Sequence, residues 1–345
     1  MIMPFDMILF HYGYRLLLLP IILCSALWLM PTNAQADISV TCTANMNNGS
    51  VNLDEITPAS ADNASITGTL NYSCDNAGDT AGYISVCLAA DGGADKPGNI
   101  VPRYMISASG DKLAFNMKLP GGIIWGDRRQ NKGTEYSSEP IYILAGQKNI
   151  SRQVPITVSL IPGEKNGQVK QGIYTNNFNG SHAELTIDSS SDSRIPDCSK
   201  ISDKRVQFSF KVKATVISSC VINAAPDIKL GNNIAGTTDI TGNNNIAITC
   251  TKDMPYYIGL TPSNKNTNGA GVMSSTGSLD TISYQLRSKP GMTKNPWGNM
   301  TTNNGNAISD DGSGELESYI VYVTVPNTDV KPATYSDIVT VTVYY

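Results

Sequence analysis

An internal repeat constrains the fold more than any other feature of this sequence. Cys42 and Cys74 are separated by almost the same number of residues as Cys220 and Cys250. Segments around them align, for example LNYSCDNAGDTAGYISVCL with IAITCTKDMPYYIGLTP, IIWGD with NPWGN, and QGIYTNNFNGSHAELTI with KPATYSDIVTVTV. Self-similarity over such lengths indicates one structural unit written twice. We therefore expect two domains of one fold, the first with a late insertion of about ten residues.

Alternating apolar residues between turn clusters indicate an all-β fold. Residues 338–345 are the clearest case, because Val339, Val341, Val343 and Tyr345 alternate with residues that would face the other side. Turn clusters such as DNAGD, DGGADKPGN and NKNTNGAG separate segments of this kind. The pattern predicts β-sandwiches, and the last segment raises the question of what pairs with a strand at a sheet edge.

The first 36 residues do not belong to the two domains. Arg15 precedes an apolar run over 16–30, and Ala34 and Ala36 then give the small-residue pattern of a signal-peptidase site. The run is too short to be a good membrane-spanning helix. We expect residues 1–36 to be a signal peptide and the remaining chain to be exported.

The remaining chain divides into an N-terminal domain over 37–198 and a C-terminal domain over 199–345. The boundary is placed near Ser199, in the polar stretch DSSSDSRIPDCSKISDK. The even number of cysteines after the signal peptide indicates disulfides in an exported chain. The repeat suggests a pairing that the sequence alone does not prove, namely Cys42 with Cys74, Cys220 with Cys250, and Cys87 with Cys198.

Motifs for catalysis or metal binding are not found. The formal net charge of −4 gives no basic surface for nucleic acid. His182 lies in NGSHAELTI without a nucleophile pattern, and the acidic turn over 309–315 lacks the ligand spacing of an EF-hand. We predict no catalytic residues, no metal site and no cofactor. An enzyme or a soluble carbohydrate-binding module is thus the weakest of the functional alternatives.

A known family carries the same combination of motifs. An alternating strand that runs into cysteine (FKVKATVISSC), a strand that ends ITCT, a Trp-Gly-Asp or Trp-Gly-Asn motif, and the terminal PATYSDIVTVTVYY resemble the spore coat protein U domain. That domain is the building block of archaic, Csu-type chaperone–usher pili. The resemblance is clear over 206–345 and looser over 38–187.

The resemblance implies two immunoglobulin-like β-sandwiches in tandem, of which the C-terminal one lacks its seventh strand. A periplasmic chaperone first fills the resulting groove, and the next pilus subunit then inserts a donor strand, which is β-strand addition. The alternative from the residues alone is a complete sandwich whose last strand ends the chain. The open groove would explain the apolar edge at Tyr345.

The resemblance also implies a place for this subunit in the assembly. Only residues 37–41 precede Cys42, too few for an N-terminal donor strand, so the chain is expected to accept a strand and not to give one. This favours a tip adhesin at the cell surface that promotes biofilm formation, with the chaperone, the outer-membrane usher, the next subunit and an abiotic or host surface as partners. The alternative is a structural shaft or spore-coat-like subunit without its own receptor contact.

The segment VQFSFKVKATVI over 206–217 has one apolar face and leaves two arrangements open. In the first, Val206 to Phe210 closes the N-terminal sandwich and the second half opens the C-terminal one. In the second, the segment is a single long first strand of the C-terminal domain.

The surface-binding residues are predicted from differences between the copies. Trp125 matches Trp297 and is expected in the core, whereas Ile123 and Ile124 stand where the second copy has a polar residue and proline. These two isoleucines are the first candidates for an exposed apolar loop. The other candidates are listed by position: Ile100 and Val101 in GNIVP, and the insertion around Phe178. The alternative for each is a loop that folds back on the sandwich.

Overall fold

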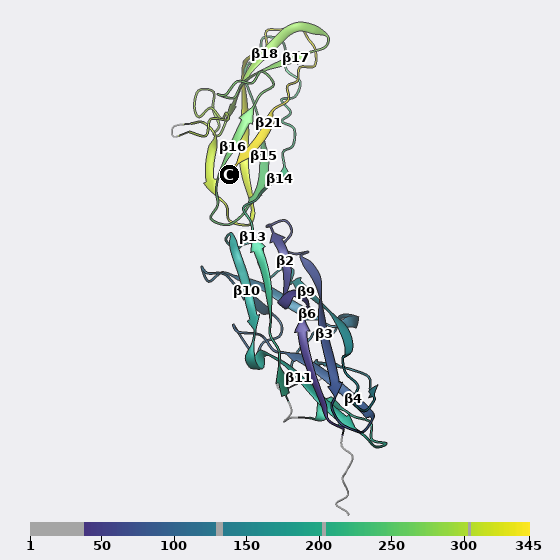
Figure 1. Cartoon of the computed structure of the whole chain (residues 1–345). Helices are drawn as coiled ribbons and strands as arrows, with labels where there is room; N and C mark the ends of the chain where they lie inside the picture. Colours follow the sequence, from purple (N-terminus) through teal and green to yellow (C-terminus); the bar gives the residue numbers. More distant parts are fainter. Residues whose placement is uncertain (1–37, 129–133, 202–204, 303–304) are drawn as a thin grey trace, which may run out of the picture. The chain divides into compact units, whose positions relative to one another are not determined.

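The computed structural model describes residues 38–128, 134–201, 205–302 and 305–345 (Figure 1), and the expected signal peptide lies outside these ranges. The described residues form strands and four short 3-10 turns, which confirms the all-β prediction. No helix in these ranges is long and apolar enough to cross a membrane.

Two sheets form the first sandwich. Its strands are β1 (Val40–Met46), β2 (Ser50–Ile56), β3 (Ser65–Asn76), β4 (Gly82–Ala90), β5 (Arg103–Ile106), β6 (Lys112–Lys118), β7 (Tyr136–Ser137), β8 (Ile141–Ile143), β9 (Ile150–Leu160), β10 (Gly172–Phe178), β11 (Ala183–Ser190), β12 (Arg205–Gln207) and β13 (Phe210–Val216). One sheet has eight strands in the order β1-β3-β9-β6-β5-β10-β13-β2. The other has the order β12-β11-β4-β7, and β8 also pairs with β4.

Two further sheets form the second sandwich, which has its own hydrophobic core. Its strands are β14 (Cys220–Ala224), β15 (Thr238–Cys250), β16 (Pro255–Thr261), β17 (Ala270–Ser275), β18 (Ser278–Arg287), β19 (Ile308–Asp311), β20 (Leu316–Asn327) and β21 (Thr340–Tyr344). The larger sheet has the order β14-β15-β20-β18-β17 and the smaller one β19-β16-β21.

The cysteine pairs of the repeat occupy the same place in both sandwiches. Cys42 lies directly opposite Cys74 in the β1–β3 ladder, and Cys220 lies opposite Cys250 in the β14–β15 ladder. Each pair is disulfide-bonded with a Cα–Cα distance of 4.1 Å. Both disulfides therefore join the first strand of a sandwich to its neighbour in the larger sheet.

Buried aromatic residues also repeat between the sandwiches. The indole Nε1 of Trp125 donates to the carbonyl of Leu88 at 2.9 Å, and that of Trp297 donates to the carbonyl of Ile258 at 2.8 Å. The hydroxyl of Tyr174 donates to the carbonyl four residues earlier at 2.7 Å, and Tyr335 does the same at 2.8 Å. These contacts give a residue-by-residue correspondence between the two sandwiches.

Strand β13 closes the first sandwich. It pairs antiparallel with β10 and parallel with β2, as the ribbon in Figure 1 shows. Its alternate side chains Phe210, Val212, Ala214 and Val216 are buried in the first core. Full burial of a Val or Phe side chain stabilises the folded state by about 1.5–3 kcal/mol. Closure of this sandwich therefore depends on residues that follow the expected boundary at Ser199.

This pairing changes the expected division of the chain. Both halves of the segment over 206–217 belong to the first sandwich, because β12 pairs with β11 and β13 with β10 and β2. The arrangement in which the second half opens the C-terminal domain does not occur. We propose that the boundary lies between Val216 and Cys220, since β14 begins the second sandwich there.

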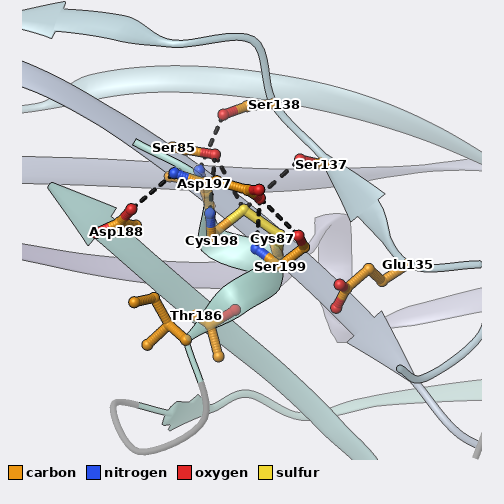
Figure 2. Close-up of a disulfide and its surroundings, with 12 residues drawn as sticks. Ser85, Cys87, Glu135, Ser137, Ser138, Thr186, Asp188, Asp197, Cys198 and Ser199 are labelled. Carbon is orange, nitrogen blue, oxygen red and sulfur yellow. Dashed lines mark hydrogen bonds between the residues drawn. A yellow bond between two sulfur atoms is a disulfide. The ribbon is translucent and has the colours of Figure 1, made fainter. Parts of the chain in front are cut away.

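A third disulfide fixes the chain before β12 and β13. Cys87 of β4 is bonded to Cys198 with a Cα–Cα distance of 5.6 Å, and Figure 2 shows the polar groups around the bond. Ser85 Oγ lies 3.0 Å from Cys198 Sγ. The guanidinium of Arg128 donates to the carbonyls of Cys198 and Ile201 at 2.6 and 2.8 Å. The segment over 198–201 is thus held against β4 just ahead of the closing strands.

Replacement of Phe210 by alanine should open the first sandwich. The ring of Phe210 stacks on Phe178 with a centroid distance of 4.5 Å and on Trp125 with one of 5.8 Å. We expect Phe210→Ala to lower the free energy of unfolding of this sandwich by about 3–5 kcal/mol. Urea unfolding measures the change, and hydrogen exchange in β10 locates it. Lys211→Ala, on the exposed side of the same strand, should change stability by less than about 0.5 kcal/mol. Equal effects of the two substitutions would contradict the closing role of β13.

Candidate functional site

A groove runs along the second sandwich between the segment that follows β14 and the segment that leads into β21. It has a volume of about 620 Å³. One wall consists of residues 225–231, which follow β14, and the other of residues 334–337 with Val339 and Val341. Apolar core residues such as Leu286 and Val323 form its floor. A smaller cavity of about 220 Å³ shares Leu230 and Tyr335 with it.

The groove occupies the position that β13 fills in the first sandwich. Tyr335 corresponds to Tyr174, so the wall over 334–337 corresponds to β10. The next residues agree, because Thr175 pairs with Ile106 of β5 and Ser336 pairs with Ser274 of β17. In the first sandwich β13 lies beside β10, whereas in the second the same wall borders the groove.

Side chains along the groove are less buried than their counterparts in the first sandwich. Tyr174 and Phe178 of β10 are fully buried in the core of the first sandwich. Tyr335 and Val339, four residues apart like that pair, pack against the second core but are only partly buried. The same holds for other residues beside the groove, namely Ile228, Leu230, Met273 and Val341. An apolar strand in the groove would therefore complete this core.

One unpaired strand edge borders the groove. In the described sheets β21, whose Val341 lines the groove, pairs only with β16. Exposed edges of this kind are templates for another strand. The groove thus offers a strand both apolar contacts and main-chain hydrogen-bonding partners.

One polar pair interrupts the apolar lining of the groove. The Tyr284 hydroxyl donates to Oδ2 of Asp337 at 2.6 Å, and both residues line the groove. Burial, and then the hydrogen bond and charge of Asp337, raise the pKa of Tyr284 well above its usual range. The tyrosine therefore stays neutral and acts as a donor to the carboxylate.

The structure divides the residues predicted to bind a surface. Val101 and Ile123 are 49% and 54% exposed, Ile124 is half-buried, and Ile100 is buried. Phe178, in the third candidate segment, lies fully inside the first core. Ile100 and Phe178 are therefore corrected from surface residues to packed ones.

The buried Arg103 explains why the loop around Ile100 folds inward. Its guanidinium donates to the carbonyls of Ile100 at 3.1 Å and of Ala90 at 2.9 Å, and also to the carbonyl of Trp125. These bonds draw the loops before β5 and after β6 together. The Ile100 side chain then packs against Gly126, where an added Cβ would come within 2.8 Å of Ile100 Cδ1.

A second group of exposed apolar side chains was not predicted from the sequence. Tyr83 and Tyr142 lie opposite each other in the β4–β8 ladder, with ring centroids 5.1 Å apart. They are 45% and 52% exposed, and Leu144, two residues beyond Tyr142, is 54% exposed. We call Tyr83, Tyr142 and Leu144 the far-end patch. The sequence feature that could have indicated these residues is their position beside the turns DNAGDTAG and LAGQKN.

The far-end patch lies at the end of the first sandwich opposite its exit at Val216. Strand β2 ends at Ile56 beside Val216, and β3 then runs back to Asn76. The turn that follows β3 leads directly to Tyr83. The loop of Ile123 instead leaves the sheet at Lys118, which pairs with Thr157 of β9. Thr157 lies about 23 Å from Ile150, the first residue of β9, at about 3.3 Å per residue. Ile123 is therefore separate from the patch.

The side chain of the buried Asn76 holds the loops of the patch in place. Its Nδ2 donates to the carbonyls of Thr80 at 2.8 Å and Leu144 at 3.0 Å. Its Oδ1 accepts from the backbone N–H groups of Ser39 and Gly78 at 3.2 and 3.0 Å. One amide thus connects three segments at this end of the sandwich.

Asn76→Ala should loosen this end of the first sandwich without unfolding it. Loss of the amide leaves buried backbone groups without partners, which costs about 1–3 kcal/mol. We expect a stability loss of that size in urea unfolding, together with faster hydrogen exchange in residues 144–147. Asn45→Ala, at an exposed position of β1, is the matched control. Exchange in residues 144–147 that is unchanged by Asn76→Ala would show that the loops are held in another way.

The comparison with protein families finds a match in the C-terminal part of the chain. Residues 206–342 match the Spore Coat Protein U domain. This confirms the resemblance seen in the sequence. The matched region starts within β12 and includes all of β13, and both strands pair in the preceding sandwich. The match therefore begins in strands that belong to the first sandwich.

Solved structures matched by this chain include pilus proteins. One is a chain of the CsuC–CsuE chaperone–tip adhesion subunit pre-assembly complex from archaic chaperone–usher Csu pili of Acinetobacter baumannii, at 15% identity, 89% coverage of this chain, 100% coverage of that chain, and a TM-score of 0.50. Another is the CupB6 tip adhesin of Pseudomonas aeruginosa, at 10% identity, 89% and 95% coverage, and a TM-score of 0.33. No curated protein matches by sequence. The first of these similarities supports the fold.

Proposed function

We propose that the protein is the terminal, surface-binding subunit of a chaperone–usher pilus. The observation that carries this proposal is that β13 closes the first sandwich while the corresponding place in the second sandwich is a groove. The role is structural and adhesive and not enzymatic. A spore-coat-like or shaft subunit without its own receptor contact is the alternative.

The groove supports the expected sequence of partners. A periplasmic chaperone would cover the groove after export, and the next pilus subunit would replace it at the outer-membrane usher by inserting its own strand. The solved structure with a similar fold is described as a chaperone–tip adhesion subunit pre-assembly complex. The half-buried residues beside the groove give such a strand its apolar contacts.

The use of β13 inside the chain supports the terminal position. In this protein β13, which lies in the region matched to the spore coat protein U domain, closes the sandwich that precedes it in the same chain. That strand is therefore already committed and cannot also fill the groove of another subunit. A subunit that accepts a strand and has its own closing strand occupied would cap a fibre.

The far-end patch supports contact with a surface. Removal of exposed apolar area from water is favourable by roughly 25 cal/mol per Å² and has no directional requirement. Tyr83, Tyr142 and Leu144 would therefore attach to many hydrophobic surfaces, abiotic or host, and promote biofilm formation. Val101, Ile123 and the half-buried Ile124 remain a second proposed contact, whereas Ile100 is buried.

Addition of a strand after Tyr345 should stabilise the second sandwich. We expect a copy of residues 206–217, joined through a flexible linker, to slow hydrogen exchange in residues 333–344 by at least about tenfold, because it would bury the groove and pair its edges. An appended copy with Phe210→Asp and Val212→Asp is the control. A second sandwich that already unfolds cooperatively, with full protection of residues 333–344 in the unextended protein, would contradict strand acceptance.

Substitution of the far-end patch should reduce adhesion and leave assembly intact. We expect Tyr83→Ser with Tyr142→Ser to lower the attachment of piliated cells to polystyrene several-fold, with the number of pili unchanged in electron micrographs. Ile173→Ser, which changes an exposed residue of β10 away from the patch, should have little effect. Ile123→Ser tests the second proposed contact. Normal attachment by the double variant would favour the Ile123 loop or a subunit without receptor contact.

A further inference from the structure

The groove carries a carboxylate where the first sandwich carries an amide. Asp337 lies two residues after Tyr335, and Asn176 lies two residues after Tyr174, so the two side chains hold corresponding positions. Asn176 is buried, whereas Asp337 is half-exposed and lines the groove. The two positions therefore present different chemistry to a closing strand.

The surroundings of Asn176 allow an apolar residue on the strand beside it. Its Nδ2 donates to the carbonyl of Gly92 at 3.0 Å, and its Oδ1 accepts from the N–H of Ala94 at 3.1 Å. Val212 of β13 lies directly opposite in the ladder and is fully buried. The amide has its partners in the loop after β4, so Val212 need not supply one.

Asp337 has a different set of partners. Its Oδ2 accepts from the Tyr284 hydroxyl at 2.6 Å, and its Oδ1 accepts from the N–H of Ile338 at 2.8 Å. An ionised carboxylate can accept about four hydrogen bonds. A strand that covers the groove would remove water from the remaining acceptor sites. A valine opposite Asp337 would leave those sites without partners in a buried setting, which is unfavourable.

We propose that the groove selects a donor strand with a hydrogen-bond-donating side chain opposite Asp337, and discriminates against a strand such as β13 that has valine there. This inference rests on the proposed function, because it specifies the strand that the groove accepts. Directly opposed residues of an antiparallel pair have Cβ atoms about 5 Å apart, within reach of a hydroxyl-to-carboxylate hydrogen bond.

The test compares two strands that differ by one isosteric change. The full mature chain is extended after Tyr345 by a flexible linker and residues 206–217, either unchanged or with Val212→Thr in the appended copy. Hydrogen exchange in residues 333–344 reports how well each strand is held. We expect the threonine strand to give about tenfold greater protection, the size of effect typical of one hydrogen bond to a charged group.

Asp337→Leu provides the matched variant. With leucine in the wall, the valine strand should give protection equal to or greater than the threonine strand, so the preference should be lost or reversed. Equal protection by both strands in the protein with Asp337 would overturn the inference and leave strand acceptance intact. No protection from either strand would overturn strand acceptance itself, and the inference with it. If Asp337→Leu does not fold, the comparison of the two strands in the Asp337 protein still decides the question.

Discussion

Each sandwich of this protein depends on a strand placed beside the segment that contains Tyr174 in the first copy and Tyr335 in the second. In the first sandwich β13 takes that place, pairs with β10 and β2, and buries Phe210, Val212, Ala214 and Val216. Without such a strand, backbone groups on two edges lack partners and apolar side chains contact water. The second sandwich shows this state, since the wall that corresponds to β10 borders a groove of about 620 Å³. The same framework therefore exists in a closed and an open form within one chain.

Disulfides and buried tryptophans stabilise the remaining strands of both sandwiches around the place of that strand. Disulfides join β1 to β3 and β14 to β15, and the buried Trp125 and Trp297 donate to corresponding carbonyls. The first sandwich has an additional disulfide, Cys87–Cys198, which fixes the chain just before β12. We interpret this extra bond as a means of positioning the internal closing strand. A strand supplied by another subunit has no need of such an anchor in this chain.

The far-end patch and the groove divide the proposed function between the two sandwiches. The patch belongs to the first sandwich, at the end opposite Val216, and its loops are connected by the amide of Asn76. The groove belongs to the second sandwich and would connect the subunit to its neighbour. An apolar contact surface has to be exposed and rigid at once, and Asn76 supplies the rigidity without covering Tyr83, Tyr142 or Leu144.

The sequence by itself determined the all-β class, the repeat and the strand alternation, because these depend on local periodicity and on spacing along the chain. It also suggested the cysteine pairs, which follow from matched positions in the two copies. The tertiary structure alone decided that Phe210 to Val216 close the first sandwich, because a strand with one apolar face can pair with either neighbour. It likewise decided that Ile100 is buried and that Tyr83 meets Tyr142, since exposure depends on what packs against a side chain. Arg103 turns the loop of Ile100 inward through carbonyls from three separate segments, and no local pattern encodes that convergence.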